Sequence, residues 1–145
     1  MESLHEYELD LEWNHDRKGT LVSAEIPLQI EVATPPDFPK GMPGIWSPEH
    51  LFIAAINSCL MTTFLAIAEN SKLEYTHFSS HASGKVDKVD GKYQVTEITL
   101  KPVVTIPEGG NKEKALRIIE MSEKNCLISN SVKTNIHMEP QVNFS

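Results

Sequence analysis

The stretch from Ser47 to Asn70, SPEHLFIAAINSCLMTTFLAIAEN, constrains the fold more than any other part of the chain. It reads as one helix of about 22 residues, roughly 33 Å long, that is apolar on nearly every side. Ser47 supplies a capping hydroxyl and Pro48 suits the first helical position, so the start of the helix is well marked. A domain built around such a helix must cover a large apolar surface.

The helix is long enough to cross a membrane, but its composition favours a core helix of a globular domain. Polar side chains interrupt the apolar run, and no second apolar run exists to share them with. They are Asn57, Ser58, Thr62 and Thr63. With 13 basic and 20 acidic residues, the net charge of −7 argues against nucleic acid or an anionic membrane surface as a partner. The N-terminal segment lacks the pattern of a signal peptide, so we expect a cytoplasmic protein.

Alternating apolar residues predict strands before the helix. Tyr7, Leu9, Leu11 and Trp13 alternate with polar residues, which is typical of a half-buried strand. Residues 20–32 read as one or two more strands. Residues 33–46 contain four prolines and two glycines and are predicted to be a long loop, a kind of segment that often carries function.

Strands and a second helix are predicted after the long helix. Residues 75–106 return to a strand pattern, and Asp90-Gly91 predicts a hairpin turn within it. Asn111 is expected to cap the second helix and Asn125 to end it. The apolar stripe of that helix is Ala115, Ile118, Ile119 and Ser122. Residues 135–142 are expected to form one short strand.

The order of these elements predicts an α+β fold with mostly antiparallel strands and the helices on one face. At 145 residues the chain is expected to form one domain, residues 1–145. One small sheet can cover only part of a helix of this length. The remaining apolar face needs a partner, and the same helix in a second subunit would supply one, so we predict a homodimer.

Cys59, halfway along the long helix, has a structural and a chemical interpretation. Free cysteine packs like a small apolar residue, and core packing is the simpler interpretation. A thiol in the middle of a helix gains nothing from the helix dipole, and apolar burial raises its pKa. For Cys59 to react as a thiolate, the sequence therefore predicts that a cation is brought to it from elsewhere.

Arg17 and Glu49 also have two interpretations each. Arg17 lies in a predicted turn and suits a solvated position, but its fork of donors could also hold a thiolate and a polar oxygen. Glu49 lies in the first helical turn, where acidic residues are favourable in any case. The functional alternative is that Glu49 holds the Arg17 guanidinium by a bidentate pair.

Taken together, these residues resemble the OsmC/Ohr family of thiol-dependent peroxidases. The resemblance lies in RKGTLVSAEIPLQIEVATP, SPEHLFIAAINSC and NCLISNSVKTNI, and extends from about residue 9 to residue 142. Its most specific parts are Pro48-Glu49, ten residues before the helical Cys59, and Cys126 in a C-x-x-S-N setting. Arg17, 32 residues before Glu49, also fits the organic hydroperoxide branch of the family.

The resemblance implies a role for each of these residues. Cys59 would be the peroxidatic thiol and Cys126 the resolving thiol, Arg17 would stabilise the thiolate, and Glu49 would orient Arg17. The family fold is an α+β dimer with intertwined subunits, in which antiparallel sheets wrap two central helices. The usual reductant of the family is a dihydrolipoyl group on a protein, and no cofactor or metal is implied.

An apolar entrance would favour organic hydroperoxides over hydrogen peroxide, because each buried methylene contributes about 0.8 kcal/mol. Candidate residues for this entrance, each of which could equally be core, are Phe38, Met42, Ile45, Trp46 and Phe52. Glu49 and Cys59 are about 15 Å apart along one helix. We therefore predict that Glu49 and Arg17 act on Cys59 of the partner subunit.

Two other classes of protein remain open. One is a binding module with this fold and inert cysteines. The other is an acyl-thioester hydrolase, because a long apolar helix wrapped by an antiparallel sheet also describes that fold class. No metal site is predicted, because the six histidines show no ligand spacing with a third ligand. These histidines are His5, His15, His50, His77, His81 and His137.

Overall fold

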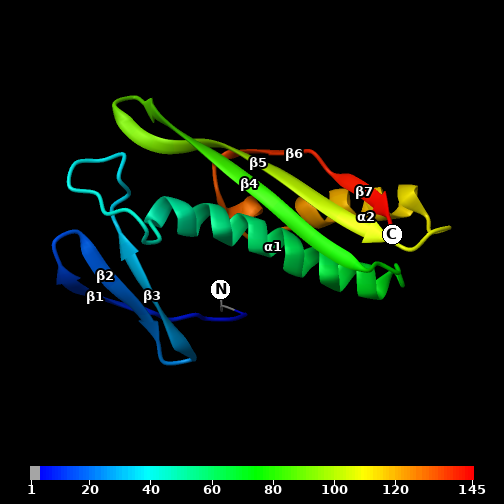
Figure 1. The fold of residues 1–145 in the computed structure, drawn as a ribbon, viewed down its shortest axis with the longest axis horizontal. Coiled ribbons are helices and arrows are strands. Elements are labelled where there is room, and N and C mark those ends of the chain that lie inside the picture. The colour runs from blue at the N-terminus through cyan, green and yellow to red at the C-terminus, as the bar shows by residue number, and fades with distance from the viewer. Residues whose placement is uncertain (1–3) are drawn as a thin grey trace. The chain divides into compact units, whose positions relative to one another are not determined.

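The computed structural model describes residues 4–145, which form two compact units. The first unit extends to Leu51 and the second is Phe52–Ser145. Helix α1 (Pro48–Asn70) begins in the first unit and continues into the second. The mixed content of helices and sheets confirms the predicted α+β class (Figure 1), and the single domain over residues 1–145 stays a prediction.

The first unit is a three-stranded antiparallel sheet in the order β1 (Asp10–His15), β2 (Lys18–Ser23) and β3 (Ile26–Ala33). Leu11 pairs with Leu21, and Leu21 pairs with Ile30. Directly paired residues point to the same face, so these three side chains belong to one apolar face. Residues 20–32, predicted as one or two strands, therefore contribute to two strands, with β2 beginning at Lys18.

β1 corresponds to the half-buried strand predicted around Leu11 and Trp13, but it is shorter and more exposed than expected. It begins at Asp10 rather than near Tyr7, and all six of its residues are exposed. Leu11 is 61% exposed, Trp13 76% and, on β3, Leu28 78%. The alternation was interpreted correctly as a strand with one apolar face, but no other element of residues 4–51 covers that face.

The loop over residues 34–46 is irregular, as predicted, and hydrogen bonds fix both of its ends. The amide of Ala33 donates to the carbonyl of Trp46 at 2.8 Å, and the amide of Met42 donates to the carbonyl of Thr34 at 2.9 Å. Helix α1 then starts as its sequence predicts. Ser47 is buried, and its Oγ accepts the amide of His50 at 3.1 Å, which is an N-cap bond.

The second unit contains a mixed four-stranded sheet. β4 (His77–Val89) and β5 (Lys92–Ile106) form a long antiparallel hairpin around Asp90-Gly91, both of which have positive φ. β6 (Asn135–Met138) and β7 (Gln141–Phe144) pair with β5 in parallel.

The prediction of a single strand over residues 135–142 was therefore wrong. The segment forms two strands, and both are parallel to β5, a direction that the sequence did not indicate. The break falls at Pro140, which has no amide hydrogen, and faces the region of β5 that contains Pro102.

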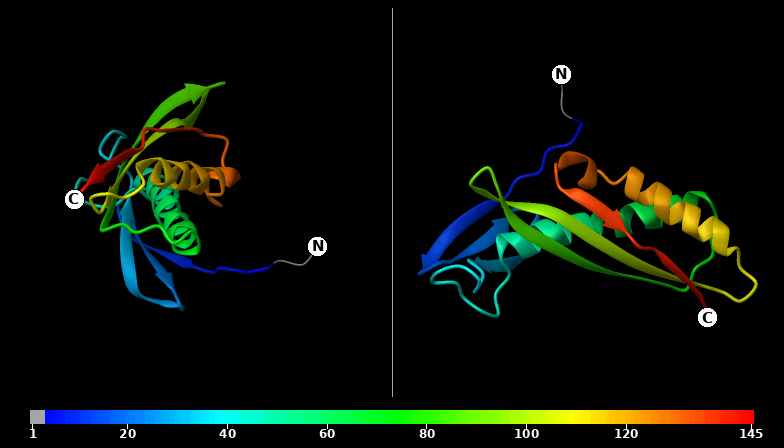
Figure 2. Two further views of the ribbon diagram at one scale, coloured as in Figure 1. Left: turned by 90° about the vertical axis from the view of Figure 1, so that its right-hand side faces the viewer. Right: turned by 90° about the horizontal axis from the view of Figure 1, so that it is seen from above.

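The core of the second unit lies between its sheet and its two helices. Helix α1 buries one stripe, Ile56, Leu60, Phe64 and Ala68. Helix α2 (Lys112–Lys124) is capped by Asn111 and buries the predicted stripe, Ala115, Ile118, Ile119 and Ser122. The two helices share one apolar cluster with β5 and β7, and they lie side by side in Figure 2.

Two contacts fix α1 against β4. The Asn57 side chain donates to the carbonyl of Ser80 at 2.9 Å and accepts the Ser80 hydroxyl at 2.6 Å. At Gly84, a Cβ atom would lie 2.4 Å from Cδ1 of Ile53, so a larger residue here would require the Ile53 side chain to shift. The polar residue in the middle of an apolar helix is thus an anchor to the sheet.

Most of the surface of α1 is left uncovered by residues 4–145. By length and composition it could cross a membrane, and only 22% of its most apolar window is buried. The prediction of a core helix therefore holds for one stripe only. Ser58, Thr62 and Ala66 form part of the uncovered surface, and their small side chains would allow a close approach by another helix.

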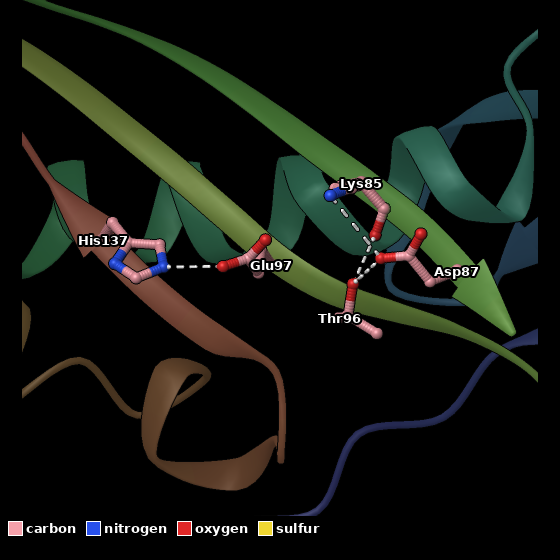
Figure 3. Close-up of polar contacts among 5 residues, drawn as sticks. All are labelled: Lys85, Asp87, Thr96, Glu97 and His137. Carbon is pink, nitrogen blue, oxygen red and sulfur yellow. Dashed lines mark hydrogen bonds and ion pairs between the residues drawn. The ribbon is translucent and has the colours of Figure 1, made fainter. Parts of the chain in front are cut away.

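The outer part of the β4–β5 hairpin is held by polar contacts between neighbouring strands (Figure 3). The register shifts between Lys85 and Val86, and here the Thr96 hydroxyl donates to Asp87 Oδ2 at 2.8 Å. Between β5 and β6, His137 Nε2 lies 3.3 Å from Glu97 Oε1.

Candidate active site

The two cysteines meet in the second unit. Cys59 lies at the midpoint of α1 and is partly buried, whereas Cys126 is buried directly after Asn125, the residue that ends α2. Both are free thiols, and their side chains are hydrogen-bond partners. A pair 67 positions apart in sequence is therefore in contact in the fold.

Hydrogen bonds lower the pKa of Cys59 below that of an ordinary thiol. Burial is the largest single influence and acts in the opposite direction, raising the pKa. The Cys126 thiol and the backbone amides of Ile128 and Leu127 outweigh it, together with the Thr63 hydroxyl, which lies 3.9 Å from the Cys59 sulfur. Consecutive amides in a turn favour an anion in the same way as a nest does.

The predicted need for a cation stays a prediction, but hydrogen bonds within this unit already lower the pKa of Cys59. The helix itself contributes little at its midpoint, as expected, but the turn that follows Cys126 aims two backbone donors at the sulfur. These donors carry no side-chain signature, so the residue types could not reveal them. The sequence signal that was available is the C-x-x-S-N segment, which turns into the short 3₁₀ helix η1 (Ser129–Ser131).

The environment of Cys126 shifts its pKa in the opposite direction. Burial raises the pKa of Cys126, and so does the neighbouring Cys59, while the Ser129 side chain and amide lower it in part. The pair thus contains one thiol whose pKa is lowered and one whose pKa is raised. This division is suited to a nucleophile and a second thiol that acts later.

We expect alkylation to distinguish the two thiols. Iodoacetamide should modify Cys59 before Cys126 at neutral pH. Because the pKa of Cys59 is lowered, its alkylation should slow down at a lower pH than the alkylation of an ordinary thiol does. Thr63→Val should raise that pKa, whereas Thr62→Val, whose hydroxyl bonds only to a backbone carbonyl, should not. Peptide mass spectrometry over a pH series measures this. Faster modification of Cys126 would contradict the assignment.

Arg17 lies in the turn between β1 and β2, exposed and at the border of two grooves in the first unit. One groove, of about 450 Å³, is formed by the apolar sheet face and includes Leu11, Trp13 and Val32. The other, of about 440 Å³, adds Lys40 and Met42 to Arg17. Among residues 4–145 no ion pair engages the Arg17 guanidinium. The Arg17 guanidinium, with its N–H donors, thus lies at the border of an apolar surface.

Glu49 is partly buried in the first turn of α1. No ion pair between its carboxylate and Arg17 is present among the residues described within one chain. The bidentate pair implied by the family resemblance stays a prediction, as does its action on Cys59 of a partner subunit.

The five candidate entrance residues are divided between the two units. Met42 lines the second groove beside Arg17. Phe52 lines a groove of about 460 Å³ in the second unit, with Tyr93, Val95 and Val132. The remaining three, Phe38, Ile45 and Trp46, are not among the lining residues of these three grooves.

Sequence reasoning missed the apolar floor beside Arg17. Leu11 and Trp13 were interpreted only as the inward positions of a strand, although their exposure makes them part of a groove. Gly19 also lines this groove, and a Cβ there would lie 2.8 Å from the carbonyl oxygen of Glu12. Strand alternation identifies the face but not whether the chain covers it.

Comparisons with known proteins identify the family to which this fold belongs. The OsmC-like protein family matches residues 39–141, and the chain belongs to that family. An OsmC-like protein of unknown function from Vibrio cholerae has a similar structure, with a TM-score of 0.85 and 25% identity, covering 94% of this chain and 99% of that one. The resemblance seen in the sequence is thereby confirmed.

Two further proteins are similar to this chain. Uncharacterized protein YmaD of Bacillus subtilis is 23% identical over 143 residues, covering 93% of this chain and 91% of that protein. An organic hydroperoxide resistance protein from Elizabethkingia anophelis has a TM-score of 0.76 at 21% identity, covering 99% of this chain and 100% of that one. At this identity the likeness shows the fold alone.

Proposed function

We propose that this protein is a thiol-dependent peroxidase that reduces organic hydroperoxides to alcohols. The observation that carries the proposal is the contact between two free thiols whose pKa values are shifted apart, lowered at Cys59 and raised at Cys126. Membership of the OsmC-like family, some of whose structural neighbours are named organic hydroperoxide resistance proteins, supports the same activity.

The reaction begins at Cys59. Its thiolate attacks the distal oxygen of the hydroperoxide, the O–O bond breaks, and the alkoxide leaves and takes up a proton to become the alcohol. Cys59 is oxidised to a sulfenic acid. The amides of Leu127 and Ile128 favour the thiolate at the start of this step.

Cys126 completes the cycle. Its sulfur attacks the sulfenic sulfur, a disulfide forms, and the hydroxyl of the sulfenic acid leaves as water. An external dithiol then reduces the disulfide by exchange. By analogy with the family the dithiol is a lipoyl group on a protein. No resident cofactor or metal enters the scheme.

A homodimer would bring the first unit to this chemistry. The uncovered surface of α1 and the exposed apolar sheet face both need a partner, and a second copy of the chain would supply it. Arg17 would then approach Cys59 of the partner subunit, held by Glu49, and stabilise both the thiolate and the departing alkoxide.

The apolar groove bordered by Arg17 suits a hydroperoxide with a hydrocarbon body and one polar end. Leu11, Trp13 and Val32 supply the apolar side, and the guanidinium faces the oxygen atoms. Of the predicted entrance residues, Met42 lines the more polar groove beside Arg17, and Phe52 lines a groove in the second unit. We place this activity in the cytoplasm, without nucleic acid or membrane as a partner.

One equivalent of cumene hydroperoxide should convert the reduced protein to an intramolecular Cys59–Cys126 disulfide. The contact between the thiols requires no large rearrangement of the chain. Intact-mass spectrometry should show the loss of two hydrogens per chain, with hydrogen peroxide reacting more slowly. Two free thiols after treatment would favour the binding module with inert cysteines. Fast turnover of an acyl-thioester in place of the peroxide would favour the hydrolase.

A further inference from the structure

The segment after α2 closes around Cys126. The amide of Cys126 donates to the carbonyl of Glu123 at 3.2 Å, and the carbonyl of Cys126 accepts the amide of Asn130 at 3.0 Å. Both bonds belong to the backbone, so they hold the thiol at a fixed place between the end of α2 and η1. Side chains of this segment are thereby brought to the sulfur.

A chain of polar contacts leads from the two thiols to a carboxylate. Cys59 and Cys126 influence each other's pKa as neighbours, and the Ser129 side chain, three residues after Cys126, lowers the pKa of Cys126 as a hydrogen-bond donor. The Ser129 hydroxyl in turn donates to Glu123 Oε2 over 3.4 Å. Thiol, hydroxyl and carboxylate are therefore consecutive members of one hydrogen-bonded path, and Glu123 and Ser129 have no role in the scheme above.

The hydrogen bonds can reverse direction as a unit. Once Cys59 is a sulfenic acid it no longer needs the S–H of Cys126, which can then donate to Ser129 Oγ while the Ser129 O–H donates to Glu123. With the proton moved to Glu123, the carboxylic acid donates to Ser129 and the Ser129 O–H donates to the Cys126 thiolate. A hydroxyl has one proton and two acceptor sites, so Ser129 serves in both arrangements.

We propose that Glu123 is a positioning residue that accepts, through Ser129, the proton released by Cys126 when this thiol attacks the Cys59 sulfenic acid. The inference rests on the proposed peroxidase cycle. The S–S bond forms between Cys126 and Cys59, the S–O bond of the sulfenic acid breaks, and the departing hydroxide takes a proton to become water. Glu123, which is partly exposed, then returns its proton to solvent, so that no further reactant is needed.

The raised pKa of the Glu123 carboxylate supports proton transfer in this direction. Burial raises the pKa of Glu123, which Ser129 lowers only in part, and burial also raises the pKa of Cys126. A stronger carboxylate base is thus combined with a thiol that needs one. Within residues 4–145 no ion pair reaches Glu123, and the titratable groups that face Cys126 are Cys59 and, beyond Ser129, Glu123 itself.

The test is a single-turnover experiment on the full chain, oxidised with cumene hydroperoxide. Trapping with dimedone follows the sulfenic acid, and intact mass follows the disulfide, from pH 5 to pH 9. Glu123→Gln should leave the first oxidation unchanged and slow disulfide formation by about 10²-fold at neutral pH. In this variant the rate should rise about tenfold per pH unit up to the pKa of Cys126, because hydroxide must then remove the proton.

Two further variants separate the relay from a structural role. Ser129→Ala should slow the same step, and the double variant should be no slower than the worse single one, because both residues serve one transfer. Glu120→Gln, on the exposed surface of α2 one turn away, should match the wild type. A wild-type rate and pH profile in Glu123→Gln would overturn the relay alone. Failure of the wild-type Cys59 to oxidise would overturn the peroxidase cycle, and the relay with it.

Discussion

Cys59→Ser is expected to abolish hydroperoxide reduction. A serine hydroxyl has a far higher pKa than a thiol, so the donors that favour the Cys59 thiolate, among them the amides of Leu127 and Ile128, cannot ionise it at neutral pH. Consumption of tert-butyl hydroperoxide with a lipoyl-type dithiol as reductant measures the loss. The rate should fall to that of the reductant alone. The substitution is nearly isosteric and the site is only partly buried, so the fold should survive.

Cys126→Ser is the matched variant. It leaves the attacking thiol in place, so one equivalent of peroxide should still be consumed per chain, and the Cys59 sulfenic acid should persist long enough to be trapped by dimedone. With a dithiol that reduces only the disulfide, the Cys126→Ser variant should complete no more than one turnover. If both variants lost the first oxidation equally, the assignment of attacking and resolving thiols would be wrong.

The second large effect concerns complementation between inactive chains. Glu49→Ala and Cys59→Ser chains should each form inactive homodimers, yet a heterodimer of the two should contain one complete site. That site combines the intact Cys59 of one chain with the intact Glu49 and Arg17 of the other. Random mixing in equal amounts should restore about one quarter of the wild-type activity, since half of the dimers are mixed and each has one intact site. Two affinity tags isolate the mixed species for assay.

A matched mixture provides the control. Arg17→Ala combined with Glu49→Ala should give inactive heterodimers, because each Cys59 would then face a partner that lacks one of the two residues. If purified heterodimers of the Glu49→Ala and Cys59→Ser chains remained inactive, each subunit would have to contain its own complete site. The argument from the distance of about 15 Å along α1 would then fail.

The elements that the sequence predicts well are those with local chemical signals. Ser47 and Pro48 mark the start of α1, Asp90-Gly91 marks the hairpin, and Asn111 marks the start of α2. Each signal acts through a bond or a backbone angle within a few residues. The apolar stripe of α2 was also predicted residue by residue, because a helical period leaves a clear pattern.

Features that depend on long-range pairing were harder to predict. β6 and β7 are too short to show a direction of pairing, and their parallel alignment with β5 depends on where α2 returns the chain. Likewise, the amides that lower the pKa of Cys59 come from Leu127 and Ile128, whose side chains do not indicate this role. The residue types identified the two thiols, whereas the fold supplied their environment.

The parallel addition of β6 and β7 to β5 has a consequence for folding during synthesis of the chain. Both strands lie downstream of Cys126, so they leave the ribosome after both cysteines have emerged. Ile128 and, on β6, Ile136 pack against the same apolar cluster as Ile56 and Leu60 of α1, so β6 helps to hold the turn at residues 127–128 against α1. The backbone donors that lower the pKa of Cys59 therefore reach their full arrangement late, after both thiols have been synthesised.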